Sequence, residues 1–466
     1  MQTHDYDLVV IGTGPAGEKA AVTAAVFGKR VAVVEKAPQV GGAVANTGTL
    51  PSKTLRETAL ALSGLKAREL YGVDLSLRRE ATVADFMHHE QRVSAQERDR
   101  ILTYFAHFGV TLYRGTASFV DPHTLRIQGP EGERWLRGDK ILIASGSAPL
   151  RPPEFDFADP RICDSDEILG LQQLPQTLAV VGAGVIGCEY ACTFAALGAA
   201  VHVIDGRDVL LGFLDREVSR ALEEAMTDLG ITFHWETRVD RCERLPAGAV
   251  YLHVDSGQTL VVDTVLVAAG RVSNTAALDL AAAGLVAGKR GLLEVDRVFR
   301  TAVPHIYAVG DVIGFPALAS TSMEQARVAM THAFDLGYKT EVSPLLPNGI
   351  YTIPEVSMVG ETEESLRKQG IDYVVGRAPY RENARGYIIG DRKGFLKLLF
   401  QRDTMQLLGV HAIGEHATEL VHIGLVVMLA SGGFDLLNRT CFNYPTLGGL
   451  YQRAAALALA RRQGLL

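Results

Sequence analysis

The chain has 466 residues, of which 47% are apolar and 21% charged, values typical of a soluble globular protein, and its length predicts two to four domains. Its formal net charge of −7 and the lack of any block of like charge argue against nucleic acids and anionic membranes as partners. The first residues carry acids where a signal peptide carries Lys or Arg, and no apolar run reaches the ~18 residues of a membrane-spanning helix. We therefore expect a cytoplasmic protein.

The first predicted element is an apolar strand over residues 8–11 that runs into the turn GTGPAG. The glycines of this turn have the spacing of a dinucleotide-binding fingerprint. Gly12 permits the tight turn, Gly14 lets the backbone approach a pyrophosphate, and Gly17 lets the following helix pack closely. That alanine-rich helix would present free N–H groups and the positive end of its dipole to the phosphates.

A second strand is predicted from Val31 to Val34, and it ends in Glu35. An acid at this position accepts hydrogen bonds from ribose hydroxyls, so Glu35 and its neighbour Lys36 are expected to contact a nucleotide. A lone glycine motif is weak evidence. Here strand, turn, helix, second strand and terminal acid are all present, and together they predict a complete nucleotide site.

The same pattern recurs about 170 residues later, in TLAVVGAGVIGCEYACTFAALGAAVHVID. Its glycines are Gly182, Gly184 and Gly187, and its second strand ends at Asp205. Two fingerprints predict two dinucleotides, one a bound flavin and the other a nicotinamide. The chain is therefore expected to be an oxidoreductase, because two redox rings held together have few other uses.

The cysteines do not suit a secreted disulfide scaffold, because they are five in number and scattered along the chain. Cys188 and Cys192 are one helical turn apart, and we expect them to be buried packing residues. No grouping of Cys and His has the spacing of a zinc site, so no metal is expected.

Three later segments each combine a strand with a turn of small residues. Residues 139–153 and 263–275 contain Gly146 and Gly270, which we expect to contact the cofactors. In residues 305–329 a strand leads to Gly310 and Asp311 and then to a helix, whose start an acid would cap.

Several motifs in the chain are shared with a known family. The general ones are GTLPSK, YAVGDV and YTIPEVSMVGETE, and the more selective ones are DPRICDSDEIL, GFLDREV and CFNYPTL. On these motifs the chain resembles the two-dinucleotide flavoprotein disulfide reductase family, which includes lipoamide dehydrogenase and glutathione reductase. Within that family it is most similar to the branch of soluble pyridine nucleotide transhydrogenases.

The resemblance implies an α/β fold with two Rossmann-like dinucleotide-binding domains, for FAD and NAD(P), and a C-terminal α+β dimerisation domain. The implied order is an FAD-binding domain begun by residues 1–150, an NAD(P)-binding domain over 151–275, a return to the FAD domain over 276–345 and an interface domain over 346–466. A homodimer or higher homo-oligomer is expected. The resemblance also implies that Asp311 holds the ribityl chain of FAD and that Thr49 contacts a cofactor.

The redox-active cysteine pair of the disulfide-using relatives is missing. The alignment of GGAVANTGTLPSK with their pattern places Val44 and Thr49 at the two sulfur positions. Because dithiol exchange requires a thiolate, reduction of lipoamide or glutathione disulfide at this site is excluded. The catalytic His and Glu near the C-terminus of those relatives correspond to Tyr444 and Gly449. Tyr444 could pack at the dimer interface or act directly, and Gly449 argues against proton chemistry there.

Lys53 and Glu189 resemble the ion pair that the family sets beside the flavin ring. A positive charge at that place stabilises the negative charge of the reduced flavin. Each residue alone could be an ordinary charge on a helix surface, but both stand at the family positions. We therefore expect Lys53 and Glu189 to be catalytic.

In the second fingerprint, the residue that ends the second strand determines which nicotinamide nucleotide binds. An acid binds the 2′-hydroxyl of NAD(H), whereas a nearby Arg accommodates the 2′-phosphate of NADP(H). The sequence has both, in Asp205 and Arg207. Asp205 argues against NADP(H) as a substrate. Arg207 would allow NADP(H) to bind, unless it is an ordinary solvated charge.

The leading hypothesis is FAD-dependent hydride transfer between NADPH and NAD+, in either direction, by a ping-pong mechanism without a redox-active disulfide. An NAD(P)H:quinone or dye reductase on the same scaffold is the alternative enzyme. A flavin-binding sensor without turnover is a third hypothesis, and the intact fingerprints and Lys53 argue against it.

Overall fold

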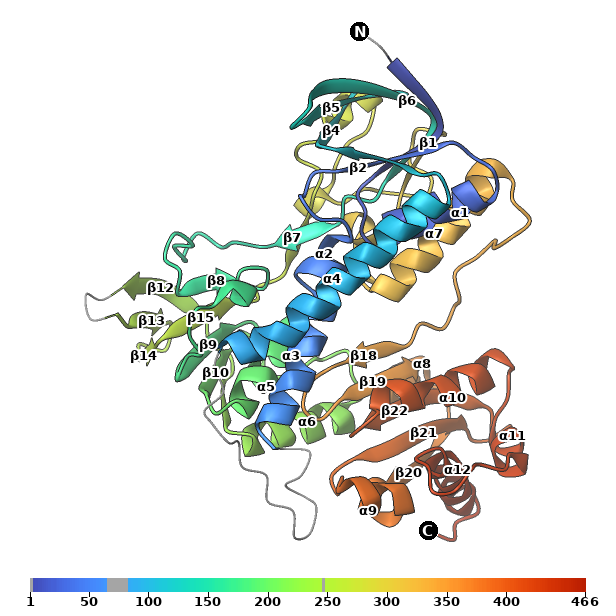
Figure 1. Ribbon diagram of the computed structural model, residues 1–466. Coiled ribbons are helices and arrows are strands. Elements are labelled where there is room, and N and C mark those ends of the chain that lie inside the picture. Colours follow the sequence, from blue (N-terminus) through green and yellow to red (C-terminus); the bar gives the residue numbers. More distant parts are fainter. Residues whose placement is uncertain (1–2, 65–82, 245–247) are drawn as a thin grey trace.

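The computed structural model describes residues 3–64, 83–244 and 248–466. It consists of three lobes, each built on a β-sheet, with the N-terminus at the outer end of one lobe and the C-terminus at the outer end of another (Figure 1). Among the helices in these residues, none combines the length and the apolar character that a membrane crossing requires.

The first lobe is built on a seven-stranded sheet in the order β3-β2-β1-β6-β5-β4, with β17 also paired to β6. The strands β1, β2, β3, β17 and the end of β6 run parallel, whereas β4, β5 and β6 form an antiparallel meander. The strands are β1 (Thr3–Ile11), β2 (Val31–Glu35), β3 (Thr111–Arg114), β4 (Thr116–Asp121), β5 (Thr124–Gly129), β6 (Gly132–Ile143) and β17 (Ile306–Ala308).

Side chains alternate between the two faces of β1, as the pleat of a strand requires. Leu8 and Val10 point into a core shared with three helices, and Val9 and Ile11 point into a second core beneath the meander. The three helices are α1 (Pro15–Val26), α4 (Val83–His107) and α7 (Ala319–Phe334), and Figure 1 shows them side by side along this lobe. The short α2 (Gly42–Asn46) and α3 (Thr49–Leu62) follow β2.

The second lobe has a five-stranded parallel sheet in the order β11-β10-β9-β15-β8. Helices α5 (Val185–Ala196) and α6 (Arg216–Asp228) pack on one face, and a three-stranded antiparallel sheet packs on the other. The strands are β8 (Ile162–Asp164), β9 (Thr177–Val181), β10 (Ala200–Ile204), β11 (Ile231–His234), β12 (Val239–Arg244), β13 (Val250–Val254), β14 (Thr259–Val262) and β15 (Thr264–Val267).

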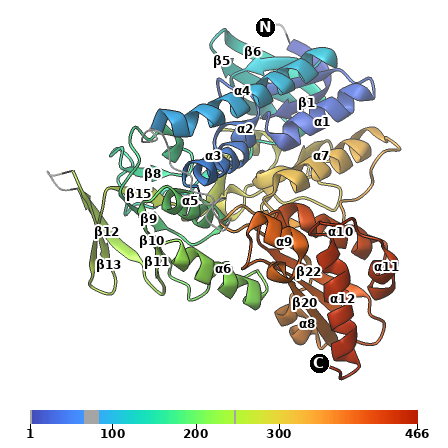
Figure 2. The same ribbon diagram turned by 60° about the horizontal axis from the view of Figure 1, so that its bottom comes forward.

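Two short strands connect these lobes. The chain leaves the first lobe through β7 (Ser147–Pro149) and returns through β16 (Arg271–Ser273), and the two strands pair antiparallel. Helices α3 and α5 from the two lobes are in contact, and Figures 1 and 2 both place them side by side.

The third lobe is an antiparallel sheet in the order β18-β19-β22-β21-β20, with helices packed around it (Figure 2). Its elements are β18 (Asn348–Ile350), β19 (Val356–Gly360), α8 (Glu363–Gln369), β20 (Tyr373–Pro379), α9 (Ala384–Ile389), β21 (Phe395–Gln401), β22 (Leu407–Ile413), α10 (Ala417–Leu429), α11 (Phe434–Arg439) and α12 (Gly449–Arg462). Short 3₁₀ helices are η2 (Ile168–Gly170), η3 (Leu280–Ala283), η4 (Lys289–Gly291), η5 (Gly310–Ile313) and η6 (Tyr380–Glu382). The predicted α/β fold class, with two dinucleotide-type lobes and an α+β C-terminal lobe, is confirmed.

Candidate active site

The first glycine turn has the geometry that a pyrophosphate requires. Gly12 has a φ of 106°, and a Cβ there would lie 2.4 Å from the carbonyl oxygen of Ala144. Helix α1 begins directly after Gly14, and no side chain among the described residues caps it. The nearest atom to a Cβ on Gly14 would be the Cα of Gly42, at 3.9 Å. The first N–H groups of α1 are therefore open to a phosphate.

Glu35 is held at the end of β2 by three donors. Its carboxylate accepts hydrogen bonds from the N–H of Thr13, at 3.0 Å, from the Thr13 hydroxyl, and from the N–H of Ala37, at 2.8 Å. The side chain is buried. Because a carboxylate has about four acceptor sites, this arrangement orients Glu35 and leaves capacity for ribose hydroxyls.

The second motif repeats this geometry. Gly182 has a φ of 108°, and a Cβ there would lie 2.5 Å from the carbonyl oxygen of Ala268. Asp205 takes the place of Glu35 and accepts hydrogen bonds from the N–H groups of Ala183, at 2.7 Å, and Arg207, at 2.9 Å. Nothing lies within 4 Å of a Cβ built on Gly184, so the backbone can be approached there too.

The second motif differs from the first in the side chain of Arg207. Its Nε and Nη2 atoms contact the two carboxylate oxygens of Asp205 at 2.8 and 2.6 Å. Burial opposes ionisation of Asp205, but the hydrogen bonds from Arg207 and Ala183 outweigh it and lower the pKa of the carboxyl. The predicted pair of nucleotide-reading residues is therefore one ion pair in this structure.

A third residue at this loop, Arg238, was not predicted from the sequence. Main-chain hydrogen bonds from Thr237 to Asp205 and from Glu236 to Arg207, 3.1 and 3.0 Å long, bring the two segments together. The exposed side chain of Arg238 then lies over Gly206, with its Nε 3.1 Å from the position a Cβ would take. Because Gly206 has no side chain, the Arg238 guanidinium stays close to Asp205 and Arg207.

Lys53 and Glu189 come together from two different lobes. The Lys53 Nζ on α3 lies 2.5 Å from the Glu189 Oε2 on α5, and the Glu189 side chain is only 7% exposed. The other oxygen of Glu189 accepts the N–H of Tyr351 from the third lobe, at 2.9 Å. The Lys53 Nζ also lies 5.1 Å from the centre of the Tyr351 ring. All three lobes therefore meet at this ion pair.

The positions of the missing sulfurs lie just before Lys53. Val44 is on α2, and Thr49 is the first residue of α3. All five cysteines are free, and the described residues bring none of them into a disulfide. Burial raises the pKa of the Cys163 and Cys192 thiols to about 12, so these thiols stay protonated near neutral pH. Cys188 and Cys192 are fully buried, as packing residues are expected to be.

Asp311 belongs to a hydrogen-bonded chain at the crossing between the first two lobes. The Ser147 hydroxyl donates to the Asp311 carboxylate at 2.6 Å, and the Arg271 Nε donates to the Ser147 hydroxyl at 2.7 Å. The prediction that a helix starts at Asp311 needs a correction. Asp311 lies in the short η5, and the helix α7 begins only at Ala319. Gly314, with a φ of 93°, ends the turn.

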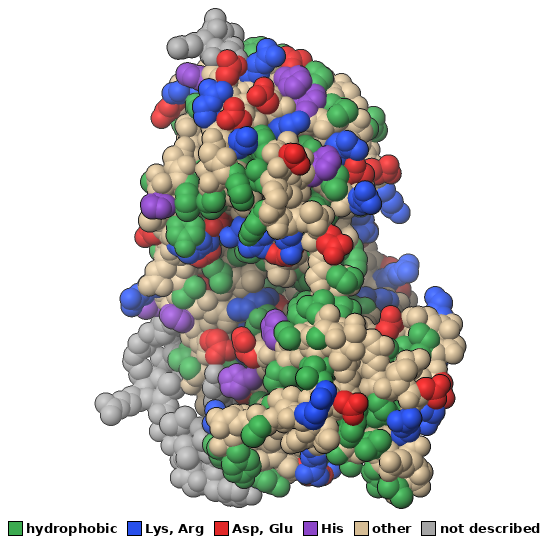
Figure 3. Space-filling model, turned by 90° about the vertical axis from the view of Figure 1, so that its right-hand side faces the viewer, with side chains coloured by type: hydrophobic (Ala, Val, Ile, Leu, Met, Phe, Trp, Pro, Cys, Tyr) green, Lys and Arg blue, Asp and Glu red, His purple; other side chains and the backbone are tan. Residues whose placement is uncertain are grey.

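The third lobe presents exposed apolar side chains. In Figure 3 apolar side chains gather on the lower part of the molecule, and charges of both signs are interspersed over the rest of that face. The large apolar residues of this lobe that are more than a third exposed are Tyr387, Ile388, Val426, Leu429, Leu436, Tyr444, Leu465 and Leu466. Tyr444 is 80% exposed, and a Cβ on Gly449 would lie 3.7 Å from the Asn383 Nδ2.

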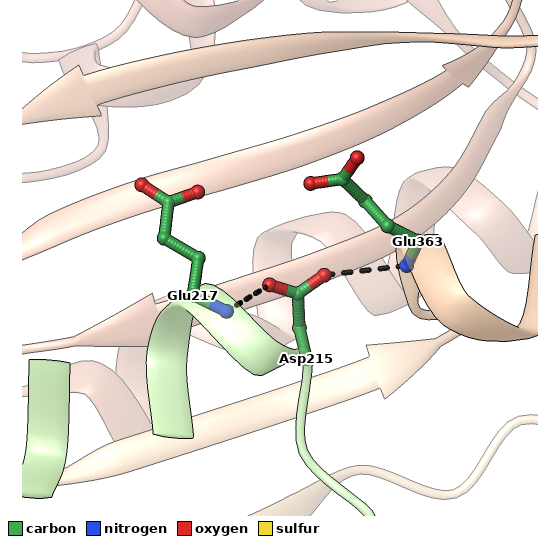
Figure 4. Close-up of side chains that lie close together, drawn as sticks. All are labelled: Asp215, Glu217 and Glu363. Atoms are coloured by element: carbon green, nitrogen blue, oxygen red, sulfur yellow. Dashed lines mark hydrogen bonds between the residues drawn. The ribbon is translucent and has the colours of Figure 1, made fainter. Parts of the chain in front are cut away.

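A cluster of three acids has the spacing of a metal site but surrounds a lysine. Asp215, Glu217 and Glu363 place carboxylate oxygens within 4.8 Å of one another (Figure 4). The Nζ of the fully buried Lys397 lies 2.8 Å from Asp215 and 3.0 Å from Glu217, and it also contacts Glu363. The ammonium pairs with all three acids, Arg377 also pairs with Glu217 and Arg367 with Glu363, and the cluster joins α6 of the second lobe to β21 and α8 of the third.

Two dinucleotide-binding motifs on the parallel strands of separate sheets, with an ion pair between the two lobes, are typical of an oxidoreductase that binds two dinucleotides. The sequence profile of a family described as pyridine nucleotide-disulphide oxidoreductase matches residues 6–333, and the profile of the dimerisation domain of that family matches residues 346–455. The chain belongs to this family. The predicted family and the predicted class of flavoprotein oxidoreductase are confirmed.

Individual relatives cover the whole chain. A soluble pyridine nucleotide transhydrogenase from Mycobacterium bovis (strain BCG / Pasteur 1173P2) is 47% identical over 464 residues, which are 99% of this chain and 98% of the relative. A protein of the same name from Colwellia psychrerythraea is 40% identical and covers 99% of both chains. The HOCl-induced flavoprotein disulfide reductase RclA from Escherichia coli superposes with a TM-score of 0.88 at 27% identity, over 97% of this chain and 99% of its own.

Proposed function

We propose that this protein transfers hydride between NADPH and NAD+, in either direction, through a bound FAD and without a redox-active disulfide. The observation that carries the proposal is the 47% identity, over nearly the full length of both chains, to proteins called soluble pyridine nucleotide transhydrogenase. The side chains of Val44 and Thr49 support it, because neither can form the thiolate that disulfide exchange needs.

The residues of the first lobe fit FAD. Gly12 and Gly14 leave a backbone cradle at the open end of α1, Glu35 is held where it could accept from a ribose hydroxyl, and Asp311 accepts a hydrogen bond from Ser147. We assign the same role in binding to Lys36, Thr49 and Gly146. When bound, FAD supplies a ring that accepts a hydride from one nicotinamide and passes it to another.

Lys53 would stabilise the negative charge that the flavin ring gains with the hydride. Glu189 fixes the ammonium at 2.5 Å and is itself fixed by the Tyr351 N–H. The pair sits between the lobe assigned to FAD and the lobe assigned to the nicotinamide nucleotide, the place where two redox rings would meet. Both residues therefore act on charge, and neither has to move a proton.

The second lobe would bind NAD(H) and NADP(H) in turn, with Gly182, Gly184, Gly187 and Gly270 at the nucleotide backbone. Arg207 pairs with Asp205, and the Arg238 side chain lies beside Gly206, the residue between them. When the Arg207 side chain swings off Asp205, a 2′-hydroxyl can donate to the freed carboxylate oxygens, whereas a 2′-phosphate can draw on both arginines. This loop therefore offers a partner to each nucleotide.

We assign residues 1–150 and 276–345 to the FAD domain, 151–275 to the NAD(P) domain and 346–466 to the interface domain. The matched dimerisation domain and the exposed apolar side chains of the third lobe support a homodimer. Size-exclusion chromatography with light scattering tests the dimer.

Anaerobic stopped-flow spectroscopy tests the proposed function. The FAD-loaded protein is first reduced with NADPH and then mixed with NAD+ or with a quinone. Rapid reoxidation by NAD+ is the expected result. Reduction by NADPH followed by reoxidation by the quinone alone would favour the quinone reductase, and a protein that takes up no FAD would overturn both.

A further inference from the structure

The segment YTIPE, residues 351–355, is a family motif of which the proposed hydride transfer uses only the main-chain N–H of Tyr351. In the structure it lies against α3. The Arg56 Nε donates to the carbonyl oxygen of Thr352 at 2.9 Å, and the Arg56 Nη1 lies 3.4 Å from the Glu355 carboxylate. Arg56 follows Lys53 by three residues and lies on the same face of α3. The segment therefore holds the face of α3 that carries Lys53.

Tyr351 contacts both members of the Lys53–Glu189 pair, each with a different part of the residue. Its main-chain N–H donates to the Glu189 Oε1 at 2.9 Å, and its ring faces the Lys53 Nζ at 5.1 Å from the ring centre. An ammonium within ~6 Å of an aromatic ring is attracted by the negative face of the ring. Lys53 thus has a carboxylate and a ring from other lobes as partners, besides a 3.3 Å contact with the hydroxyl of Ser52 on its own helix.

We propose that Tyr351 is a positioning residue that holds the Lys53 ammonium in place through its ring. The inference rests on the proposed function, because it takes Lys53 to act on the flavin. Lysine carries its charge on a flexible four-carbon stem, and one carboxylate with a long contact to the neighbouring Ser52 hydroxyl leaves that charge room to swing around the carboxylate. A ring at a second point removes this freedom and fixes the charge where the flavin needs it.

The test compares Tyr351→Leu with Tyr351→Phe. Both variants keep the main-chain N–H that binds Glu189, so only the ring differs between them. The midpoint potential of the bound FAD is measured by anaerobic dye titration, and the rate of flavin reduction is measured at saturating NADPH. We expect Tyr351→Leu to make the potential more negative and to slow reduction about tenfold, with nucleotide affinity little changed. Tyr351→Phe should stay close to the wild-type potential.

A double-mutant cycle with Lys53→Met separates this inference from the proposed function. If the ring acts through Lys53, Tyr351→Leu should change the potential of wild type but not that of the Lys53→Met variant. A change of equal size in both backgrounds, or a wild-type potential in Tyr351→Leu, overturns the inference. A wild-type potential in Lys53→Met instead overturns the assigned role of Lys53. Tyr351→Met, which fills a similar volume without a ring, replaces the Leu variant in the cycle if that variant does not fold.

Discussion

Arg207 closes a two-point ion pair on Asp205, with nitrogen–oxygen distances of 2.8 and 2.6 Å, at the position where a nicotinamide nucleotide carries its 2′-substituent. The corresponding acid of the first motif, Glu35, has the same main-chain donors but no such cation on the residue two positions on, which is Ala37. The two motifs share their geometry and differ in charge. This difference suits the proposed function, in which the second site would accept two nucleotides in turn and the first would hold a single flavin.

The Gly12→Ala variant should lose FAD. The new methyl group would lie 2.4 Å from the Ala144 carbonyl oxygen, and the φ of 106° is unfavourable for alanine. The purified variant should lack the yellow colour of the wild type, which is expected to hold about one FAD per chain. Gly170→Ala, where nothing lies within 4 Å of the new carbon, is the control and should keep its flavin absorbance.

Thiol reagents should leave the nucleotide reactions untouched. Val44 and Thr49 cannot form a thiolate, and Cys188 and Cys192 are fully buried. Lipoamide and glutathione disulfide should not be reduced faster than by free flavin, and arsenite or an alkylating agent should not slow hydride transfer between nucleotides. Strong inhibition would mean that one of the five cysteines takes part in the reaction after all.

Lys53→Met should slow flavin reduction far more than it weakens nucleotide binding. The lost charge stabilises a state that forms during the reaction, and such losses lower kcat and leave KM little changed. Steady-state kinetics with NADPH and an NAD+ analogue measure both constants. Lys368→Met, on the exposed part of α8, serves as the control for loss of a positive charge. A rise confined to KM would contradict the role given to Lys53.

The glycine turns and the acids that end the second strands could be predicted from the sequence, because these features are local. The second strand of each motif ends at its predicted acid or one residue before it, whereas β1 starts at Thr3, earlier than the predicted Leu8. The buried, apolar part of a strand can be recognised in the sequence, whereas its polar first residues cannot. The domain boundaries and the roles of the site residues stay predictions.

Apart from the Lys53–Glu189 pair, which the family resemblance implied, the long-range contacts of the site could not be predicted. Arg238 reaches the nucleotide loop through main-chain pairing, and Tyr351 reaches Lys53 across about three hundred residues of chain. Lys397 gave no signal either, because an isolated lysine in an apolar strand does not reveal which acids will surround it. Such residues can be identified only when the fold brings segments that are distant in the sequence together.

Lys397→Met should destabilise the protein by about 3–5 kcal/mol, because it leaves three carboxylates without their buried cation. Urea unfolding measures the loss. Lys393→Met, which removes an exposed pair with Asp228, should cost no more than about 1 kcal/mol. A loss in Lys397→Met no larger than that of the control would contradict the role of the cluster.

The same cluster predicts a pH dependence. Burial opposes ionisation of Asp215, but the nearby His411 and Lys397 outweigh it and lower the pKa of the carboxyl below its ordinary value. A lowered folded-state pKa contributes stability above the unfolded pKa of ~3.9, and that stability is lost as the pH falls through the folded pKa. The difference in unfolding free energy between wild type and Lys397→Met should therefore shrink below about pH 4. A difference that stays constant down to pH 3 would show that Lys397 stabilises the fold through packing instead.

The nucleotide preference gives the sharpest test of the second motif. Asp205 places a negative charge where a 2′-phosphate would lie, and like charges brought together without water cost up to several kcal/mol, with each 1.4 kcal/mol a tenfold change in affinity. Arg207 offsets part of this cost, so the enzyme should prefer NAD(H) and use NADP(H) less well. Asp205→Asn frees Arg207 for the phosphate and should raise kcat/KM for NADPH at least tenfold, at some cost to NADH. Arg207→Ala and Arg238→Ala should each harm NADPH far more than NADH, which steady-state kinetics with the two nucleotides will show. Equal effects of all three substitutions on both nucleotides would mean that this loop does not distinguish a 2′-hydroxyl from a 2′-phosphate. An NAD(P)H:quinone reductase would then become the better-supported function.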